Sequence, residues 1–408
     1  MANSLQGTEK ASSLKLSAPF LFIITLGYAV YAVDRTVLSA VLAPVSSSLA
    51  LTNPEIGLLS AAQYIGVTCV VFLSGYLSDR YGRWPMMIGG VAVFSAFTWL
   101  IGFSSSFSEA FLFRLVSGFG EGAFWPVAMA SAADYFRARK GFALGIFYVG
   151  FDAGSVAGLS IGGIAYSLSG MWNTAFFIAP LIGVFVLVGM LLARKRLPLS
   201  STDGTRISLG RDALRLLRKR GVIIIMIFAF LATWSSVWQV VFLPFYFFKE
   251  MHFTVLSSSL LSSVVTLTGM FGKVIFGRVS DSIRRNGLLI AVSVATLASY
   301  AIFFFSSFGF AVNFAAALSM GFFSASIFPV MQALMADLGG GRTTGSALGL
   351  STSSQSIATI FSPIIAASLF TIGVGRALAL GAMLPLGLAL VCLVFLREPR
   401  SRAIGEGE

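Results

Sequence analysis

The sequence is poor in charged residues and almost devoid of cysteine and histidine. Only 11% of its 408 residues are Asp, Glu, Lys or Arg, whereas 57% are hydrophobic and the mean hydropathy is +0.89. Soluble domains carry about 25% charged residues, so this composition excludes an ordinary soluble protein. The two cysteines, Cys69 and Cys392, lie inside apolar runs. A disulfide framework is therefore not expected.

The chain also lacks the usual motifs of catalysis and of metal or nucleotide binding. It contains no G-x-x-x-x-G-K loop, no cluster of His and Cys, and no polar region long enough for a catalytic domain. The single histidine, His252, is predicted to be a solvent-exposed residue of an outer loop. We therefore expect neither an enzyme nor an ATP-driven pump, and no cofactor or metal.

Long apolar runs dominate what is present. A membrane-spanning helix needs roughly 20 mostly apolar residues, and we count twelve such runs along the chain. They lie near 18–45, 54–77, 84–103, 108–136, 140–167, 172–194, 221–248, 255–280, 287–306, 308–336, 343–372 and 376–396. The sequence thus predicts an all-α membrane protein with twelve transmembrane helices.

The distribution of charge predicts the orientation in the membrane. The net charge is +12, but most Lys and Arg lie in the N-terminal tail, the even-numbered loops and the C-terminal tail. By the positive-inside rule, both termini are predicted to be cytoplasmic, in the inner (plasma) membrane of the cell. We expect the lipid bilayer as the surrounding partner, no nucleic acid, and a monomer.

The longest polar stretch divides the predicted spans six and six. The predicted parts are a cytoplasmic N-terminal tail (1–17), an N-terminal six-helix bundle (18–194), a cytoplasmic linker (195–220), a C-terminal six-helix bundle (221–396) and a cytoplasmic C-terminal tail (397–408). Within the linker, residues 208–219 either form an amphipathic helix on anionic lipid or act as a simple tether.

The two halves of the chain share a repeat. The sequence GYLSD at 75–79 recurs as GRVSD at 277–281, WPV at 125–127 as FPV at 328–330, and GFALG at 141–145 as GSALG at 345–349. The three matches occur in the same order and at similar spacing. Internal repeats of this kind are typical of alternating-access carriers.

These motifs make the whole chain resemble the major facilitator superfamily. Residues 75–83 (GYLSDRYGR) resemble its signature loop, G-x-L-x-D-R-x-G-R, and residues 114–122 (RLVSGFGEG) resemble its helix 4 motif, R-x3-G-x-G-x-G. The resemblance implies two pseudo-symmetric six-helix bundles that transport by alternating access. In the second half, Ser282 replaces the basic residue of the loop and Arg284 its glycine, so we expect an asymmetric gating latch.

The signature loop is interpreted as a conformational latch, with a helix cap beside topogenic arginines as the alternative. Gly75 would permit a close helix approach and Gly82 a tight turn, while Asp79 could pair with a neighbouring helix end. The predicted gating residues are Gly75, Asp79, Arg80, Gly82, Arg83 and Asp281.

Charged residues inside the predicted spans mark the candidate site. Asp34 and Arg35 stand together in the first span, although each charge costs at least ~2.5–3.5 kcal/mol at a helix centre. Within the superfamily, this pair and Glu121 resemble the anion:cation symporters, which carry organic acids with protons, and the Spinster-like carriers of lysophospholipids and sphingolipids. The resemblance implies that Asp34, Arg35 and Glu121 bind substrate and proton.

The chemistry suggests a role for each charge. Arg35 is predicted to clamp an anion because guanidinium can bind a carboxylate with two hydrogen bonds. A carboxylate removed from water favours its protonated form, whereas a nearby arginine favours the charged form. A substrate that binds Arg35 would therefore leave a carboxylate ready to take up a proton. Binding of the anion and binding of the proton are then coupled. The predicted proton-coupling residues are Asp34, Glu121, Asp152 and Arg114.

Alternatives remain for several of these residues. Asp34, Arg35, Arg114 and Glu121 could instead form a neutral buried network that only fixes two helices. Asp152 is either a third proton site or an ion-pair partner of Arg114.

The rest of the predicted substrate site is less charged. Tyr31 can neighbour Asp34 or Arg35 by helical spacing. Lys273 either binds the other end of an anion or extends to the headgroups, and Trp238 and Gln239 shape a pocket or pack. The predicted substrate-binding residues are Arg35, Tyr31, Lys273, Trp238 and Gln239.

The predicted function is secondary active transport, with proton-coupled symport of a small organic anion such as a carboxylate or sugar acid. One alternative is a Spinster-like carrier of lysophospholipids or other amphiphiles. Another is a non-transporting receptor built on a carrier fold.

Overall fold

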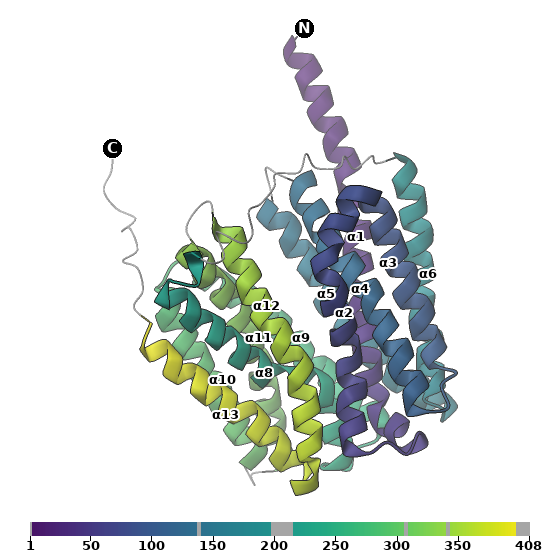
Figure 1. Cartoon of the computed structure of the whole chain (residues 1–408), viewed down its shortest axis with the longest axis vertical. Coiled ribbons are helices and arrows are strands. Elements are labelled where there is room, and N and C mark those ends of the chain that lie inside the picture. The colour runs from purple at the N-terminus through teal and green to yellow at the C-terminus, as the bar shows by residue number, and fades with distance from the viewer. Residues whose placement is uncertain (1, 137–139, 197–214, 306–308, 340–342, 397–408) are drawn as a thin grey trace. The chain divides into compact units, whose positions relative to one another are not determined.

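A computed structural model describes residues 2–136, 140–196, 215–305, 309–339 and 343–396, and this part of the chain is built of helices (Figure 1). In the first half these are α1 (Ala2–Ser48), α2 (Asn53–Tyr81), α3 (Arg83–Ile101), α4 (Phe107–Tyr135), α5 (Lys140–Ser169) and α6 (Asn173–Arg196). In the second half they are α8 (Arg220–Lys249), α9 (Val255–Val279), α10 (Arg285–Phe305), α11 (Phe310–Gly339), α12 (Thr344–Ser368), the 3-10 helix Leu369–Ile372 and α13 (Val374–Val394).

Each predicted apolar run coincides with one of these long helices, so the prediction of an all-α membrane protein is confirmed. Eleven helices in the described residues are long and apolar enough to cross a membrane. The remaining long helix, α4, has 29 residues but is less apolar, because it carries Arg114 and Glu121 in its middle. It brings two of the four charged residues to the site, and α1 brings the other two.

The helix contacts group the chain into two compact units. Unit 1 comprises Met1–Thr205 with Val240–Leu267, and unit 2 comprises Arg206–Gln239 with Thr268–Glu408. The second part of α8 and the first part of α9 thus belong to unit 1, and the predicted division into bundles at 18–194 and 221–396 stays a prediction. The first helix begins at Ala2, inside the predicted tail. Most of the predicted linker and the C-terminal tail lie outside the described residues.

In unit 1, small residues let the helices approach closely. Glycines recur at every fourth position of α5, at Gly150, Gly154, Gly158 and Gly162, on the face that packs against α1. A Cβ atom at Gly162 would lie 2.6 Å from the Cβ of Ala40. Small residues at such positions are typical of helix packing in membranes.

The crossing of α2 and α4 is equally close and determines where the site lies. Gly66 on α2 faces Gly118 on α4, and a Cβ atom at Gly118 would lie 3.0 Å from the Cα of Gly66. One turn from Gly66, the backbone of Gln63 also contacts Gly118. The amide of Gln63 is therefore held against α4, next to Glu121.

In unit 2, hydroxyl groups tie α8 to its neighbours. Ser235 donates to the carbonyl of Ala382 (2.6 Å), and Ser362 donates to the carbonyl of Trp234 (3.0 Å). Such hydrogen bonds satisfy polar groups where water is absent.

Candidate functional site

An ion pair between α1 and α4 lies at the centre of the site. Arg35 Nε donates to Glu121 Oε2 at 2.9 Å, and the two side chains are 16% and 0% exposed. The guanidinium carbon also lies 4.5 Å from the ring centroid of Tyr31 and 4.9 Å from that of Tyr64. Cation–π attraction to two rings and the charge of Glu121 together hold Arg35 in place.

Asp34, the neighbour of Arg35, has more partners than Glu121. Its carboxylate accepts hydrogen bonds from Ser117 (2.5 Å), Gln63 (2.7 Å) and Thr98. Arg114 Nη1 lies 3.9 Å from Asp34 Oδ1, and both side chains are 3% exposed. Donors from α2, α3 and α4 thus converge on one carboxylate of α1, which stabilises its charged form.

The amide of Gln63 joins the two acidic residues. Its Nε2 donates to Asp34 Oδ2 at 2.7 Å and to Glu121 Oε1 at 2.8 Å. Because one amide nitrogen carries two hydrogens, each carboxylate receives one.

Arg114 fixes the backbone of α1 as well as the charge of Asp34. Its Nη1 and Nη2 donate to the carbonyl oxygens of Asp34 and Arg35, each at 3.1 Å. The alternative in which Arg114 pairs with Asp152 is not observed, because its ion pair is with Asp34. Asp152 is buried on α5, 6% exposed.

Sequence reasoning missed four residues of this site: Gln63, Tyr64, Thr98 and Ser117. Ser117 could have been found, because it lies between Arg114 and Glu121 at spacings of three and four residues, which place all three on one helix face. Gln63 is a polar amide inside an apolar run, which is a recognisable signal. Nothing in the sequence distinguishes Thr98 from other threonines of the spans.

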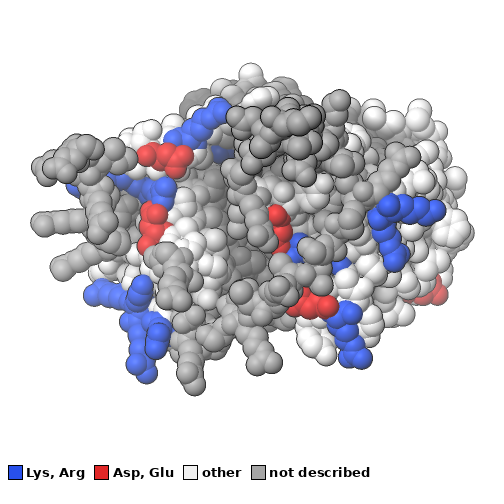
Figure 2. Space-filling view, turned by 90° about the horizontal axis from the view of Figure 1, so that it is seen from above, with Lys and Arg blue, Asp and Glu red and all other residues white. Residues whose placement is uncertain are grey.

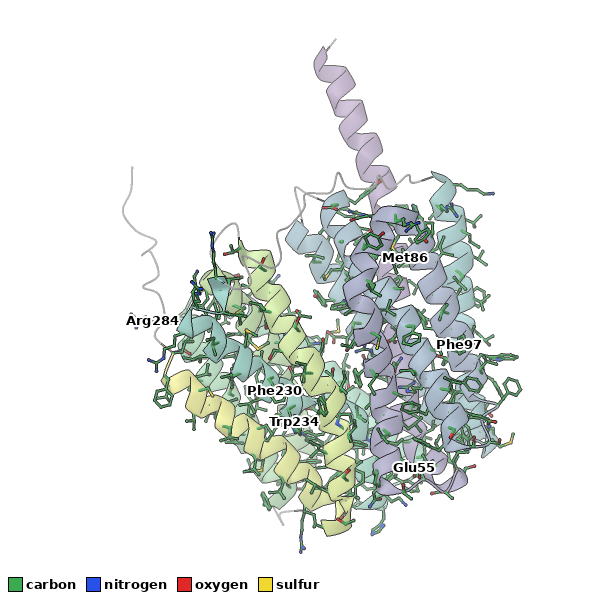
Figure 3. All side chains as sticks on the ribbon, viewed as in Figure 1. Glu55, Met86, Phe97, Phe230, Trp234 and Arg284 are labelled. Carbon is green, nitrogen blue, oxygen red and sulfur yellow. The ribbon has the colours of Figure 1, made fainter. Side chains whose placement is uncertain are left out.

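The predicted gating loop lies between α2 and α3, at the end of unit 1 where α1 begins. Figure 3 labels Met86 near this end and Glu55 near the opposite one, and Figure 2 looks onto this end, where acidic and basic side chains are both present. Gly82 has φ of +90°, a conformation that favours glycine. At Gly75, in contrast, a Cβ atom would meet nothing within 4 Å, so the predicted close approach is not observed.

One arginine of the loop forms an ion pair that was not predicted. Arg83 Nη2 lies 2.5 Å from Asp134 Oδ2 at the end of α4, whereas Asp79 and Arg80 are exposed. The guanidinium of Arg80 lies 5.6 Å from the ring of Tyr81.

The second half contains the equivalent pair. Arg285 Nη1 lies 2.5 Å from Asp337 Oδ2, and its Nη2 lies 3.3 Å from Asp281 Oδ1. Like Arg83 after Asp79, Arg285 follows its loop aspartate by four positions. The departures at Ser282 and Arg284 therefore do not remove the ion pair, and the asymmetry of the gating latch stays a prediction.

The predicted substrate residues of the second half belong to unit 2, whereas Tyr31 and Arg35 belong to unit 1. Trp238 is 1% exposed and packs on Tyr300 and Phe304, with ring centroids 5.6 and 5.2 Å away. Gln239 Oε1 accepts a hydrogen bond from Ser324 at 2.9 Å, and Lys273 is half-buried on α9. Trp238 is a packing residue in this conformation.

Several proteins of known name are similar in sequence. Protein spinster of Drosophila melanogaster is 29% identical over 162 residues (40% of this chain, 27% of the relative). The 3-(3-hydroxy-phenyl)propionate transporter of Escherichia coli is 26% identical over 195 residues (48% and 46%). A probable 4-methylmuconolactone transporter of Cupriavidus pinatubonensis is 30% identical over 129 residues (31% and 30%). The chain thus spans less than half the length of each of these relatives.

Solved structures show the same fold. A bacterial homologue of the lysosomal transporter Spinster, in an inward-facing and unoccupied conformation, superposes with a TM-score of 0.76 at 16% identity, covering 93% of this chain and 95% of that one. The nucleoside transporter NupG superposes with a TM-score of 0.77 at 13% identity, covering 93% and 98%. Residues 24–319 match the Major Facilitator Superfamily. The chain belongs to this superfamily, whose members are transporters and not enzymes.

Proposed function

We propose that this secondary transporter couples the movement of a small organic anion to that of a proton, using Arg35 for the anion and Glu121 for the proton. The observation that carries the proposal is the 2.9 Å pair between these two side chains, one partly accessible and the other fully buried. A guanidinium with a single carboxylate partner can exchange it for the carboxylate of a substrate.

The hydrogen bonds support different roles for the two carboxylates. Asp34 accepts from Gln63, Thr98 and Ser117 and also faces Arg114, so its negative charge is stabilised whether or not Arg35 is present. Among the described residues, the Glu121 carboxylate accepts hydrogen bonds only from Arg35 and Gln63. We therefore assign proton exchange to Glu121 and treat Asp34 with Arg114 as a fixed pair. This assignment combines the two interpretations drawn from the sequence, proton coupling and a buried network that fixes two helices.

Coupling then follows from electrostatics. When a substrate carboxylate binds Arg35, the fully buried Glu121 loses its counter-charge, and its neutral, protonated form becomes favoured. Conversely, a protonated Glu121 releases Arg35 for the anion. The coupling is reciprocal, as any linkage between two binding equilibria must be.

An aromatic or other cyclic acid is the substrate class that we propose. The rings of Tyr31 and Tyr64 lie beside Arg35, and Phe151 lies 6.1 Å from Tyr31 between ring centroids. Aromatic walls beside a guanidinium suit a planar, ring-bearing carboxylate. The names of two relatives, which refer to 3-(3-hydroxy-phenyl)propionate and 4-methylmuconolactone, agree with this class.

The second candidate is transport of a lysophospholipid or similar amphiphile. It is favoured by the relatives named spinster, which are 27–29% identical to part of this chain.

Purified protein in liposomes separates these candidates. With an inward proton gradient, we expect accumulation of labelled 3-(3-hydroxyphenyl)propionate that stops when a protonophore removes the gradient. Movement of lysophospholipid without uptake of the acid would favour the second candidate. Saturable binding of a solute without flux of any would favour a receptor.

Orientation and assembly are further proposals. We propose that both termini are cytoplasmic, in the inner membrane, and that the protein is a monomer. Labelling of cysteines introduced at residues 7 and 404, compared between intact and broken cells, tests the orientation of the termini. Light scattering in detergent tests whether the protein is a monomer.

A further inference from the structure

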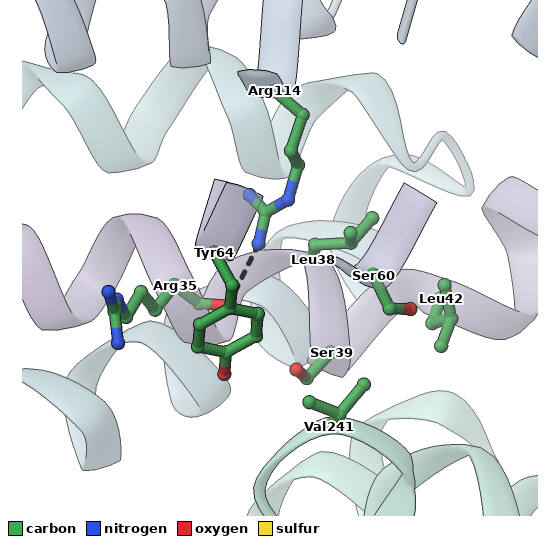
Figure 4. A pocket seen from close by; sticks show the side chains of 8 residues that line it. All are labelled: Arg35, Leu38, Ser39, Leu42, Ser60, Tyr64, Arg114 and Val241. Carbon is green, nitrogen blue, oxygen red and sulfur yellow. Dashed lines mark hydrogen bonds between the residues drawn. The ribbon is translucent and has the colours of Figure 1, made fainter. Parts of the chain in front are cut away.

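A small polar chamber lies beside Arg35, on the side of the site toward the end of α1. Its volume is about 10 Å³, and Figure 4 shows Arg35, Leu38, Ser39, Leu42, Tyr64 and Arg114 around it. A cavity of about 10–15 Å³ can hold one water molecule if it offers two to four polar partners. The volume alone is therefore compatible with a single water.

Three polar groups around this chamber have no partner among the described residues. Arg114 Nε is buried and makes no hydrogen bond, although the other two nitrogens of the same guanidinium do. The hydroxyls of Ser39 and Tyr64 also form none. A buried N–H without an acceptor is costly. A water in the chamber would give Arg114 Nε the acceptor that it lacks, and the hydroxyls of Ser39 and Tyr64 line the same chamber.

Aromatic packing closes the opposite side of Arg35. Toward the beginning of α1, Tyr28 stacks on Phe147 with ring centroids 4.2 Å apart, and Tyr31 packs near Phe151. In the other direction, Ser39 and Leu42 place the chamber one to two turns beyond Arg35 on α1. Along α1, aromatic rings thus lie on one side of Arg35 and the polar chamber on the other.

Arg35 contacts both this chamber and the proton carrier. It lines the chamber and binds Glu121, which is fully buried and does not line it. The other charged or titratable groups near Glu121 are Asp34, Arg114, Tyr31 and Tyr64.

We propose that the chamber is a water site formed by Arg114 Nε, Ser39 and Tyr64, and that Arg35 blocks contact between this water and Glu121 until a substrate carboxylate draws the guanidinium away. A hydronium ion that reaches the chamber then gives its proton to Glu121 Oε2, and a neutral water remains. The water site does not depend on the proposed function, whereas the blocking role of Arg35 does.

Hydroxyl-radical labelling by a short X-ray dose tests the water site without any substrate. Radiolysis of a bound water labels the side chains that surround it. We expect labelling of Leu38 and Leu42, which are 3% and 0% exposed, at a level severalfold above Leu59, which is 1% exposed and does not line the chamber. Equal labelling of the three leucines would overturn the proposal.

A variant that fills the chamber tests the same point. Ser39→Val replaces the hydroxyl by methyl groups and should reduce labelling of Leu38 and Leu42 to the level of Leu59. Ser46→Val is the matched control, since Ser46 is a buried serine of α1 whose hydroxyl already donates to Ala43 (2.8 Å). If the control lowers labelling as much as Ser39→Val, the water does not lie at this site.

Transport tests the blocking role separately. In liposomes, Ser39→Val should slow proton-driven uptake of 3-(3-hydroxyphenyl)propionate severalfold, leave counterflow exchange within about twofold, and unfold at the temperature of the Ser46→Val control. Unchanged driven uptake, with labelling abolished, would refute the proton route but leave the water site. If the wild-type protein moves no acid at all, the proposed function fails and the labelling result still stands.

Discussion

Asp34 and Glu121, two acidic residues on different helices, are bridged by a single amide nitrogen of Gln63, 2.7 Å from one carboxylate and 2.8 Å from the other. Without this donor, Asp34 would keep its hydrogen bonds from Ser117 and Thr98, whereas Glu121 would keep the one from Arg35. The amide therefore makes the four charges one connected network, and its position depends on the crossing of α2 and α4.

The first prediction concerns this bridge. Replacing Gln63 by Leu keeps the volume but removes one hydrogen bond from each carboxylate, so we expect the free energy of unfolding to fall by about 1–3 kcal/mol. Thermal unfolding in detergent measures the change. The control is Gln355→Leu, because within the described part of the chain the Gln355 amide donates only inside its own helix, to Ser351 (3.1 Å). Equal losses in both variants would argue against a special role for Gln63.

The second prediction separates the two acidic residues. Glu121→Gln should abolish the dependence of uptake on the pH gradient while counterflow exchange persists, because a glutamine resembles the protonated acid. Asp34→Asn should instead lower stability by about 3–5 kcal/mol, since it leaves the buried Arg114 unpaired. Exchange assays and unfolding curves check both. If Asp34→Asn folds normally and uncouples transport, the two roles must be interchanged.

The third prediction concerns the anion. Arg35→Lys keeps the positive charge but loses the planar group between Tyr31 and Tyr64 and the capacity for two parallel hydrogen bonds. One charged hydrogen bond contributes about 1.5–3 kcal/mol, so the dissociation constant for the acid should rise tenfold or more. Isothermal titration with purified protein gives this constant directly, and an unchanged value would remove Arg35 from the binding site.

The fourth prediction concerns the ion pairs that close each signature loop. Because Asp134 is partly exposed, its pair with Arg83 should contribute only about 0.2–1 kcal/mol to stability. Asp134→Asn should nevertheless slow counterflow exchange severalfold if the pair is part of a latch. A double variant that swaps the two charges, Arg83→Asp with Asp134→Arg, should restore part of the counterflow rate. A helix cap without a gating role would show no such rescue. The same cycle on Arg285 and Asp337 tests the second half.

The fifth prediction concerns helix packing. Gly118→Ala should lower the free energy of unfolding by about 1–3 kcal/mol, because the added methyl group would meet the backbone of Gln63 and Gly66. Gly75→Ala should leave stability nearly unchanged, since the space around Gly75 is open. Thermal unfolding of both variants provides the comparison, and a stable Gly118→Ala protein would contradict the close crossing.

Several features of the site could be predicted from the sequence because they are local. Asp34, Arg35, Arg114 and Glu121 were recognisable as charges inside apolar runs, where unpaired charges are costly and pairing is expected. Asp134 was missed although the repeat indicates it, since it follows Pro126 by the same eight positions that separate Asp337 from Pro329.

The positions of the apolar spans, and the presence of charge within those of the first half, were determined by the sequence, because hydropathy over about 20 residues decides whether a segment enters a membrane. The tertiary structure alone decided which charges pair. Arg35 binds Glu121 and Arg114 binds Asp34 because glycines at Gly66 and Gly118 let α2 and α4 touch and insert Gln63 between the two acids. Contacts of this kind depend on the approach of helices far apart in the chain, which no local pattern of residues specifies.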